Sequence, residues 1–375
     1  MKSFLYRASV CLRRCPGLPL GQNLSLSLCL GLASTLLATQ VIADSDRAID
    51  HGPIGVMGDH FHKAGEWMVS ARLMRMHMSG NQLGDDELSD SDVIMQPNAP
   101  GRMPAVLSVV PQDMDMDMLM LGAMYAPSDR LTLMAMVMAS SKDMALTSYA
   151  PPNMMNPGPR NVVGGFSVSS DDIQSIALSG LFRLQQNASR RTHLTLGLEQ
   201  SIADADATDT VLTPMGMNTT MRLPYGMQIG DESLRLSAAL THVYRHNDWA
   251  FGGQISGKFK LSAEEWHFGD SQQATAWAQR EMSHHLSLSG RLTYARASGL
   301  EGMDARIMAP VQTAIPANYG YQKWHVGLGA NAVVSLFPGQ PERLGIELAL
   351  PVATDTRGVQ MTPEWHLTLG IQKAF

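Results

Sequence analysis

The sequence is poor in cysteine. Only three thiols occur in 375 residues, Cys11, Cys15 and Cys29, and all of them lie before residue 44. A chain that loses this segment keeps no thiol. A disulfide framework and a thiolate metal site are therefore both excluded from the rest of the protein.

Acidic residues are missing from the first 43 positions. An apolar stretch at 24–43 follows a basic start and ends with Ala43 before Asp44. This order predicts a secretory signal peptide, residues 1–43, cleaved near Ala43. An uncleaved membrane anchor is the alternative, because 24–43 is about long enough to span a bilayer as a helix. Its Ser and Thr content and the lack of a basic stop favour cleavage. The cations of the basic start are Lys2, Arg7, Arg13 and Arg14.

Blocks of basic residues are also lacking. The whole chain has a net charge of −6, and removal of the signal peptide leaves 24 Lys and Arg against 34 Asp and Glu. An acidic chain without a basic patch argues against nucleic acid as a partner.

Beyond residue 43 no apolar run reaches the roughly 18 residues that a transmembrane helix needs. If the mature chain enters a membrane, it must do so as a closed β-barrel. That is the other architecture in which every backbone group is hydrogen-bonded within the lipid.

The mature sequence alternates repeatedly between apolar and polar residues, which predicts strands with one apolar face. In 249–261, for example, Trp249, Phe251 and Ile255 oppose Gln254 and Lys258. About twelve such segments are predicted: 66–78, 113–125, 130–140, 172–183, 191–201, 232–244, 249–261, 272–282, 286–297, 319–335, 343–351 and 360–375.

The connections between these segments alternate in length. Short links such as 245–248 and 283–285 alternate with generally longer ones such as 79–112 and 202–231. Short turns at one rim and long loops at the other are typical of outer-membrane barrels. We therefore predict an all-β, transmembrane, antiparallel up-and-down barrel of about 12 strands at 66–375. Residues 44–65 precede it as a periplasmic segment.

The end of the chain supports the same fold. Trp365, Leu367 and Leu369 alternate down to the terminal Phe375, as in the last strand that the outer-membrane assembly machinery binds. Lys373 departs from this pattern, because an apolar residue is usual there. The predicted location is the outer membrane of a Gram-negative bacterium, with membrane lipid and the assembly machinery as partners.

A soluble periplasmic β-sandwich or propeller would show the same alternation. Against it, many charged side chains share the polar face, and a dry core would have to pair every one of them. A water-filled lumen suits them better. The predicted lumen-lining residues are Arg183, Glu199, Arg235, Arg245, Lys258, Lys260, Arg291, Arg343 and Glu347.

Methionine is abundant, with 27 in the chain, and it is patterned. Within each of three predicted strands the methionines fall on one face, and in 113–125 an Asp row takes the other. If the Leu residues point to lipid, the methionines line the lumen. The rows are Met74, Met76 and Met78; Met114, Met116, Met118, Met120 and Met124; and Met134, Met136 and Met138.

Three interpretations of this ladder remain open. Thioethers suit Cu(I) and silver ions, and imidazoles suit Cu(II) and zinc, so that His60 and His62 could take part in metal capture. A flexible apolar surface would also suit a small hydrophobic solute. Methionine can simply fill the lumen. The metal candidates are the ladder residues Met74, Met76, Met78, Met114, Met116, Met118, Met120, Met134, Met136 and Met138, with His60 and His62.

Signs of an enzyme are absent from the sequence. It has no HExxH, GxSxG or nucleotide-binding glycine motif. A hydrolase in the membrane would need a Ser bonded to an oriented His. Ser283 lies in a predicted short turn beside His284 and His285, and His366 with Thr368 builds no obvious relay. We predict no catalytic residue.

Residues 58–76 (GDHFHKAGEWMVSARLMRM) and 114–136 (MDMDMLMLGAMYAPSDRLTLMAM), with the terminal strand, resemble a family of bacterial outer-membrane proteins. The family is generically called transporters and is related to the barrels of the phenol meta-cleavage pathway. The resemblance implies an outer-membrane barrel and small-molecule uptake, but no specific substrate.

Two classes of function follow. The first is an outer-membrane channel or transporter-like barrel for small solutes, either hydrophobic or aromatic compounds or soft metal ions such as copper. The second is a non-transporting surface protein that binds metal through Met, Asp and His.

Overall fold

The computed structural model describes residues 47–152 and 159–375. The predicted signal peptide, with the three cysteines, lies outside these residues. No helix in the described part of the chain is both long and apolar enough to cross a membrane.

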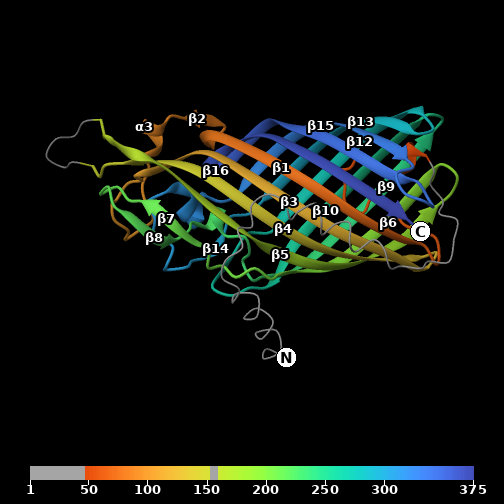
Figure 1. Ribbon diagram of the computed structural model, residues 1–375, viewed down its shortest axis with the longest axis horizontal. Coiled ribbons are helices and arrows are strands. Elements are labelled where there is room, and N and C mark those ends of the chain that lie inside the picture. Colours follow the sequence, from red (N-terminus) through yellow and green to blue (C-terminus); the bar gives the residue numbers. More distant parts are fainter. Residues whose placement is uncertain (1–46, 153–158) are drawn as a thin grey trace. The chain divides into compact units, whose positions relative to one another are not determined.

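A ring of eleven antiparallel strands forms the body of the protein (Figure 1). Each pairs with the next strand of the ring along the chain, and the pairing of β16 with β1 closes it. The ring strands are β1 (Trp67–Gly84), β3 (Val109–Ser128), β4 (Leu131–Tyr149), β5 (Val162–Gln186), β6 (Arg190–Ser201), β9 (Leu234–His246), β10 (Trp249–Ser262), β12 (Ser271–Ser283), β13 (Leu286–Ala297), β15 (Tyr321–Val334) and β16 (Glu342–Ala374).

The remaining elements are small. β2 (Asp86–Leu88) pairs with the end of β1, and β7 (Thr208–Leu212) pairs with β8 (Asn218–Arg222). A second small sheet joins β11 (Trp266–His267) to β14 (Glu301–Gly302). The short helices are α3 (Asp90–Val93) and the 3-10 turns η2 (Ala48–Asp50), η3 (Tyr225–Met227), η4 (Gln312–Ala314) and η5 (Pro316–Asn318).

β16 is a 33-residue element that folds back on itself. Residues 342–356 pair with β15, and 356–374 pair with β1. An ion pair between Lys373 and Glu342 and a 2.5 Å bond from Arg343 Nη1 to Gln372 Oε1 bring its two ends together. β16 therefore contributes two antiparallel arms, and the predicted barrel of about 12 strands is confirmed. Lys373, unusual in a last strand, lies there as the partner of Glu342.

Four strands extend well beyond their predicted ends. β1, β3, β4 and β5 each continue for several residues towards the long loops. Outward positions on these extensions are polar, such as Asp143 and Asp171, so that the apolar alternation stops before the hydrogen-bonded strand does. The sequence pattern marks the lipid-facing length of a strand, which is shorter than its paired length.

The outer face of the ring is apolar. Trp67 stacks on Tyr125 near the short-turn end, with ring centroids 4.4 Å apart. Exposed aliphatic and aromatic side chains recur at every second position along the strands, as expected for a surface that contacts lipid. They include Leu73, Leu121, Leu133, Leu178, Leu196, Leu240, Phe251, Ile255, Leu288, Leu328, Leu348 and Leu369.

The two rims differ as the loop lengths predicted. Links of two or three residues join β3 to β4, β5 to β6, β9 to β10 and β12 to β13. The C-terminus lies at the same rim, opposite the end that carries α3, β2, β7 and β8 (Figure 1).

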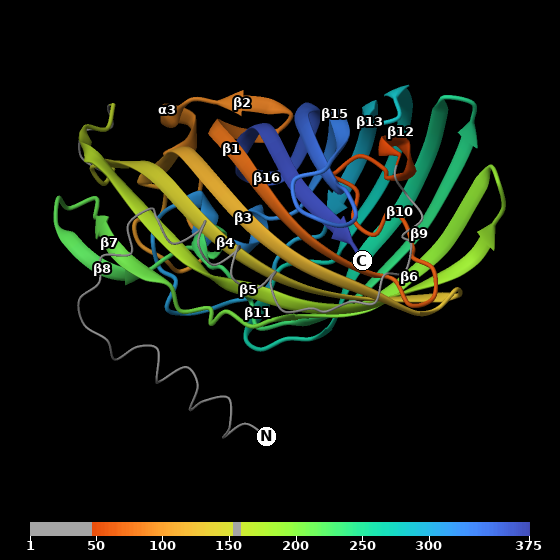
Figure 2. The same ribbon diagram turned by 45° about the vertical axis from the view of Figure 1, so that its right-hand side comes forward.

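Residues 47–65, expected as a periplasmic segment before the barrel, lie inside its short-turn half (Figure 2). We call them the plug. Ile49 and Val56 are buried against Val243, Ala250 and Trp277 of the wall. Side chains that donate to plug backbone carbonyls come from strands around the ring: Arg72, Arg183, Arg191, His193, Gln254, Gln279, Ser287, Asn331 and Arg343.

The long loops fold over the opposite end of the lumen. Tyr225 and Met227 of η3 are fully buried and pack with Trp266 and Ile307. Lys142, an inward residue of β4, donates to the carbonyls of Gly226 at 3.0 Å and Gln228 at 2.7 Å. Both ends of the lumen are therefore occupied by the protein's own chain.

The lipid-facing belt gives a direct test. Leu328 lies at the middle of β15 with 69% of its surface exposed. We expect Leu328→Arg to destabilise the barrel by about 2–4 kcal/mol in lipid vesicles, because the guanidinium would meet hydrocarbon. Denaturant titration of vesicle-embedded protein measures this. The control is Leu336→Arg, in the link between β15 and β16, which should lower the free energy of unfolding by only about 0–1 kcal/mol. Equal losses would contradict the assignment of the belt.

Candidate functional site

The inner wall over β1, β3 and β4 is lined by methionine. Met74 pairs with Met118, Met76 with Met116 and Met78 with Met114 across β1 and β3, directly opposite one another. Because facing residues of an antiparallel pair point to the same side, each pair projects into the lumen together. We call this surface the methionine wall.

β4 extends the methionine wall by a third strand. Met138 pairs with Met120, Met134 with Met124, and Met136 lies opposite Gly122. The predicted ladder residues therefore lie on one continuous inner surface. Met68 and Met124 are buried with Leu181 of β5, and Met134 packs against them.

The Asp row of β3 faces outward, away from the methionines. Asp115 pairs with His77 and Asp117 with Arg75 across β1 and β3, and the Arg75 Nη2 atom lies 3.1 Å from Asp115 Oδ2. Alternation along a strand separates the two rows by the thickness of the wall. No site can combine these Asp and Met side chains.

Charged residues predicted to line the lumen are placed mostly on the wall opposite the methionines, and most of them contact one another or the plug. Glu199 pairs with Lys258 at 2.6 Å, and Arg291 with Glu347 at 2.5 Å. The others bond as follows: Arg235 to Asp231, Arg245 to Asp50, Arg183 to the His62 carbonyl, Arg343 to the Gly52 carbonyl, and Lys260 to Glu301 at 3.7 Å near the long-loop rim.

Two glycines of β16 leave the space in which a plug side chain packs. A Cβ added at Gly345 would lie 2.8 Å from Ile54 Cβ, and one at Gly370 would lie 2.7 Å from Ile54 Cδ1. Both contacts are closer than real Cβ atoms tolerate, so Ile54 occupies a notch that only glycine leaves open. Gly55 in turn lies against the carboxylate of Glu347.

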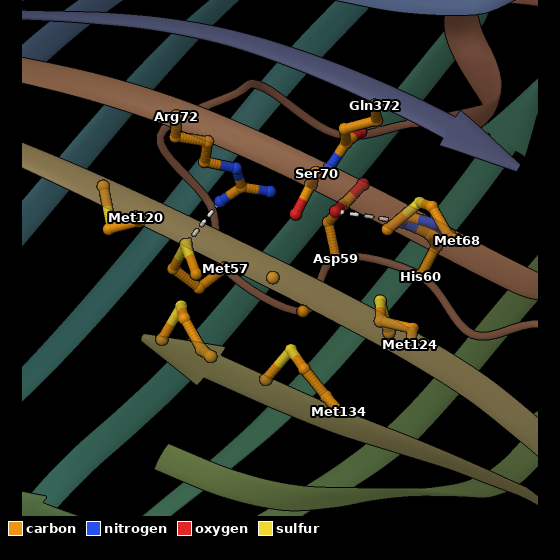
Figure 3. Close-up of a pocket in the computed structure, with 13 residues that line it drawn as sticks. Met57, Asp59, His60, Met68, Ser70, Arg72, Met120, Met124, Met134 and Gln372 are labelled. Carbon is orange, nitrogen blue, oxygen red and sulfur yellow. Dashed lines mark hydrogen bonds and ion pairs between the residues drawn. The ribbon is translucent and has the colours of Figure 1, made fainter. Parts of the chain in front are cut away.

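Between the plug and the methionine wall lies a small cavity of about 20 Å³ (Figure 3). Met57 and His60 border it from the plug, and Met120, Met124 and Met134 from the wall. This volume holds about one water molecule. This cavity therefore has no room for a solute larger than water.

The two predicted histidines belong to the plug rather than to the wall. His60 borders the cavity, and His62 donates its backbone N–H to Thr132 of β4 at 3.0 Å. Burial lowers the pKa of His60 to about 4. Burial would raise the pKa of Asp59, but the neighbouring His60 and Arg343 hold it well below its usual range.

Several residues of this site were not predicted from the sequence. Met57 and Asp59 lie in the plug, which shows no strand alternation, and so they carried no signal of an inward position. Met68 and Arg72 lie on the inner face of β1, where Arg72 donates to the Val56 carbonyl. The alternation of 66–78 could have identified both.

No family model and no curated protein matches the chain. Among solved structures, an outer membrane channel from Pseudomonas putida F1 is similar, with a TM-score of 0.53 and 11% identity over 86% of this chain and 100% of that chain. A Pseudomonas aeruginosa FadL homologue has a TM-score of 0.42 and 7% identity over 89% of this chain and 99% of that chain. The P. putida toluene transporter TodX has a TM-score of 0.40 and 11% identity over 83% of this chain and 90% of that chain. At these identities the first likeness shows the fold, an outer-membrane-type β-barrel.

The Arg291–Glu347 pair should be the strongest electrostatic link under the plug. We expect Glu347→Gln to lower the free energy of unfolding by about 3–5 kcal/mol, because the largely buried Arg291 loses its ionic partner. Replacing both residues by Met should cost less. Urea titration of the vesicle-embedded proteins compares the free energies of unfolding of the single and the double variant. Glu301→Gln, which breaks an exposed pair with Lys260, is the control at about 0–1 kcal/mol. A double variant that loses more than the single one would contradict the role assigned to this pair.

Proposed function

We propose that this protein is an outer-membrane channel that admits small hydrophobic or aromatic solutes. The proposal places the barrel in the outer membrane of a Gram-negative bacterium, with the short turns and the plug on the periplasmic side. The closed ring and its apolar outer face support the membrane location, since both are what a spanning barrel requires.

The methionine wall is the observation that carries the choice of solute. Three adjacent strands present unbranched thioether side chains to the lumen. Such side chains adapt to apolar molecules of different shapes. The two cations on the same face, Arg72 and Lys142, donate to backbone carbonyls of the plug and of the long loops. A route for ions would be favoured by unpaired charges facing it, whereas Arg291 and Glu347 neutralise each other on the other wall.

The plug makes this a gated channel. It is held largely through its backbone carbonyls: Gln254 donates to Met57 at 2.9 Å, and His193 Nε2 lies 2.7 Å from the Gly58 carbonyl. Water can replace such hydrogen bonds at little net cost. Displacement of the plug would turn the cavity beside the methionine wall into an open passage.

Passage of copper or silver ions, and the alternative of a non-transporting surface metal binder, stay predictions from the sequence. Four ladder methionines, Met120, Met124, Met134 and Met136, line the space of about 20 Å³ beside the plug. Packing accounts for these four without an ion.

A double variant tests the role of the methionine wall. We expect Met120→Gln with Met136→Gln to reduce the influx of toluene into proteoliposomes about tenfold, because about 1–2 kcal/mol of apolar contact is lost. Met95→Gln, at an exposed loop position, is the matched control. If toluene influx is unchanged while conductance stays normal, the proposed solute class is wrong.

A glycine variant tests the gate. Gly370→Val should dislodge Ile54 and raise the single-channel conductance in planar bilayers severalfold over wild type. Gly290→Val is its control, because a Cβ there meets nothing within 4 Å. A protein that conducts no better after Gly370→Val, or after deletion of residues 44–65, would speak against a movable plug.

A further inference from the structure

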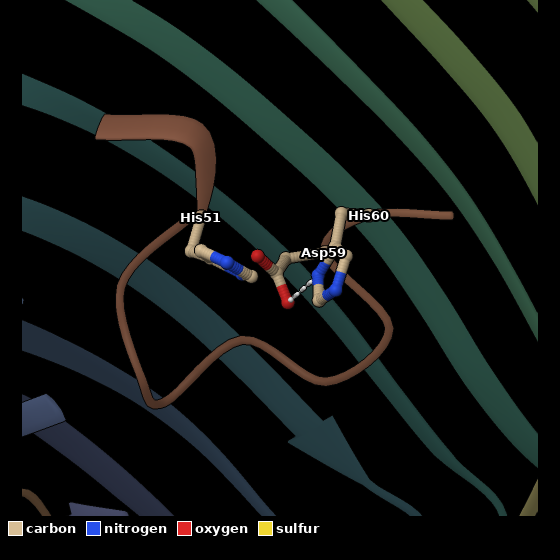
Figure 4. A group of neighbouring side chains, drawn as sticks. All are labelled: His51, Asp59 and His60. Atoms are coloured by element: carbon tan, nitrogen blue, oxygen red, sulfur yellow. Dashed lines mark hydrogen bonds and ion pairs between the residues drawn. The ribbon is translucent and has the colours of Figure 1, made fainter. Parts of the chain in front are cut away.

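Three histidines of the plug lie together. The rings of His51 and His60 are 4.4 Å apart between centroids, and those of His60 and His62 are 4.9 Å apart. All three side chains are buried. His51 and His60 face each other across the loop that runs from residue 51 to 60 (Figure 4).

Two of these imidazoles are oriented by carboxylates. His60 Nδ1 lies 3.0 Å from Asp59 Oδ1, and His62 Nδ1 lies 3.4 Å from Glu66 Oε2. The second oxygen of Asp59 accepts the backbone N–H of Gly52 at 2.7 Å. Both oxygens of Asp59 are thus engaged, so this residue positions His60 and is not itself needed as a ligand.

The other nitrogen of each of these two rings has no protein partner. His60 Nε2 and His62 Nε2 are both buried without a hydrogen bond. An unsatisfied buried nitrogen costs about 1–3 kcal/mol. A carboxylate at Nδ1 with Nε2 left open is the arrangement that metal-binding histidines adopt.

The spacing fits a metal ion. Ligand atoms of His51, Asp59 and His60 lie within 4.8 Å of one another. Two imidazoles bound to one tetrahedral ion at about 2.0–2.1 Å have centroids about 5 Å apart. The 4.4 Å between His51 and His60 and the 4.9 Å between His60 and His62 are close to this value, and His60 is the ring common to both pairs. A cavity of about 330 Å³ at the short-turn rim borders His51, His60 and His62 and offers a path of entry.

We propose that His51 and His60, with His62 beside them, form a binding site for one divalent transition-metal ion of the zinc and copper class. Neutral imidazoles suit these ions. Asp59 offsets the positive charge of the nearby Arg343 and positions His60, and Glu66 positions His62. The ion would link the two ends of the 51–60 loop and so stabilise the plug in its position inside the barrel. This site does not depend on which solute the channel admits.

The test uses the mature protein, folded in detergent micelles without a polyhistidine tag and titrated calorimetrically with ZnCl₂. We expect one Zn²⁺ per chain. The pair His60→Gln and His62→Gln should weaken binding by about a hundredfold or more, and Asp59→Asn by about 10–100-fold. Affinity within about twofold of wild type is expected for the matched control, His284→Gln with His285→Gln, which removes two exposed histidines of a short turn.

Absence of Zn²⁺ binding at micromolar concentration would overturn the proposal. So would an equal loss in the control pair. If the plug variants do not fold, electron paramagnetic resonance of the wild-type protein loaded with Cu²⁺ decides instead. Splitting from at least two imidazole nitrogens supports the site, and a spectrum with fewer nitrogens refutes it. Neither result bears on toluene influx, so the channel proposal stands or falls separately.

Discussion

Closure of the sheet is the constraint on which the structure depends. A strand edge in lipid would leave a row of N–H and C=O groups without partners, at several kcal/mol for each group. Pairing of β1 with β16 removes that edge, and the return of β16 on itself supplies the last span. Once the ring is closed, alternation divides every strand between lipid and lumen. The chemistry of the protein is thereby confined to the inward residues.

Those inward residues divide the lumen into two unlike surfaces. The methionine wall is apolar and adaptable, whereas the opposite wall carries ion pairs such as Arg291–Glu347. The charged wall binds the plug through its backbone, and the glycine notch at Gly345 and Gly370 fixes the position of Ile54. The plug thus lies between two unlike surfaces, and both hold it, since Arg72 of β1 also donates to the Val56 carbonyl. This asymmetry connects the packing of the lumen with the proposed gate.

Much of the fold could be predicted from residues alone. Period-2 patterns located the strands, because lipid requires an apolar residue at each outward position. They failed where that requirement ends, as in the extension of β4 beyond residue 140. The inward direction of Met116 and Met118 was also predictable, since their outward neighbours Leu119 and Leu121 fix the parity of the strand.

The amino-acid order was enough for the architecture, the different loop lengths at the two rims and the faces of each strand, because all of these follow from local alternation and loop length. The position of the plug, in contrast, came from the folded chain alone. Residues 47–65 have no periodicity, and their place depends on partners far along the chain, such as Asn331 and Arg343. The meeting of His51, His60 and His62 is likewise a product of folding, because nothing in their spacing requires the loop between them to close inside a barrel.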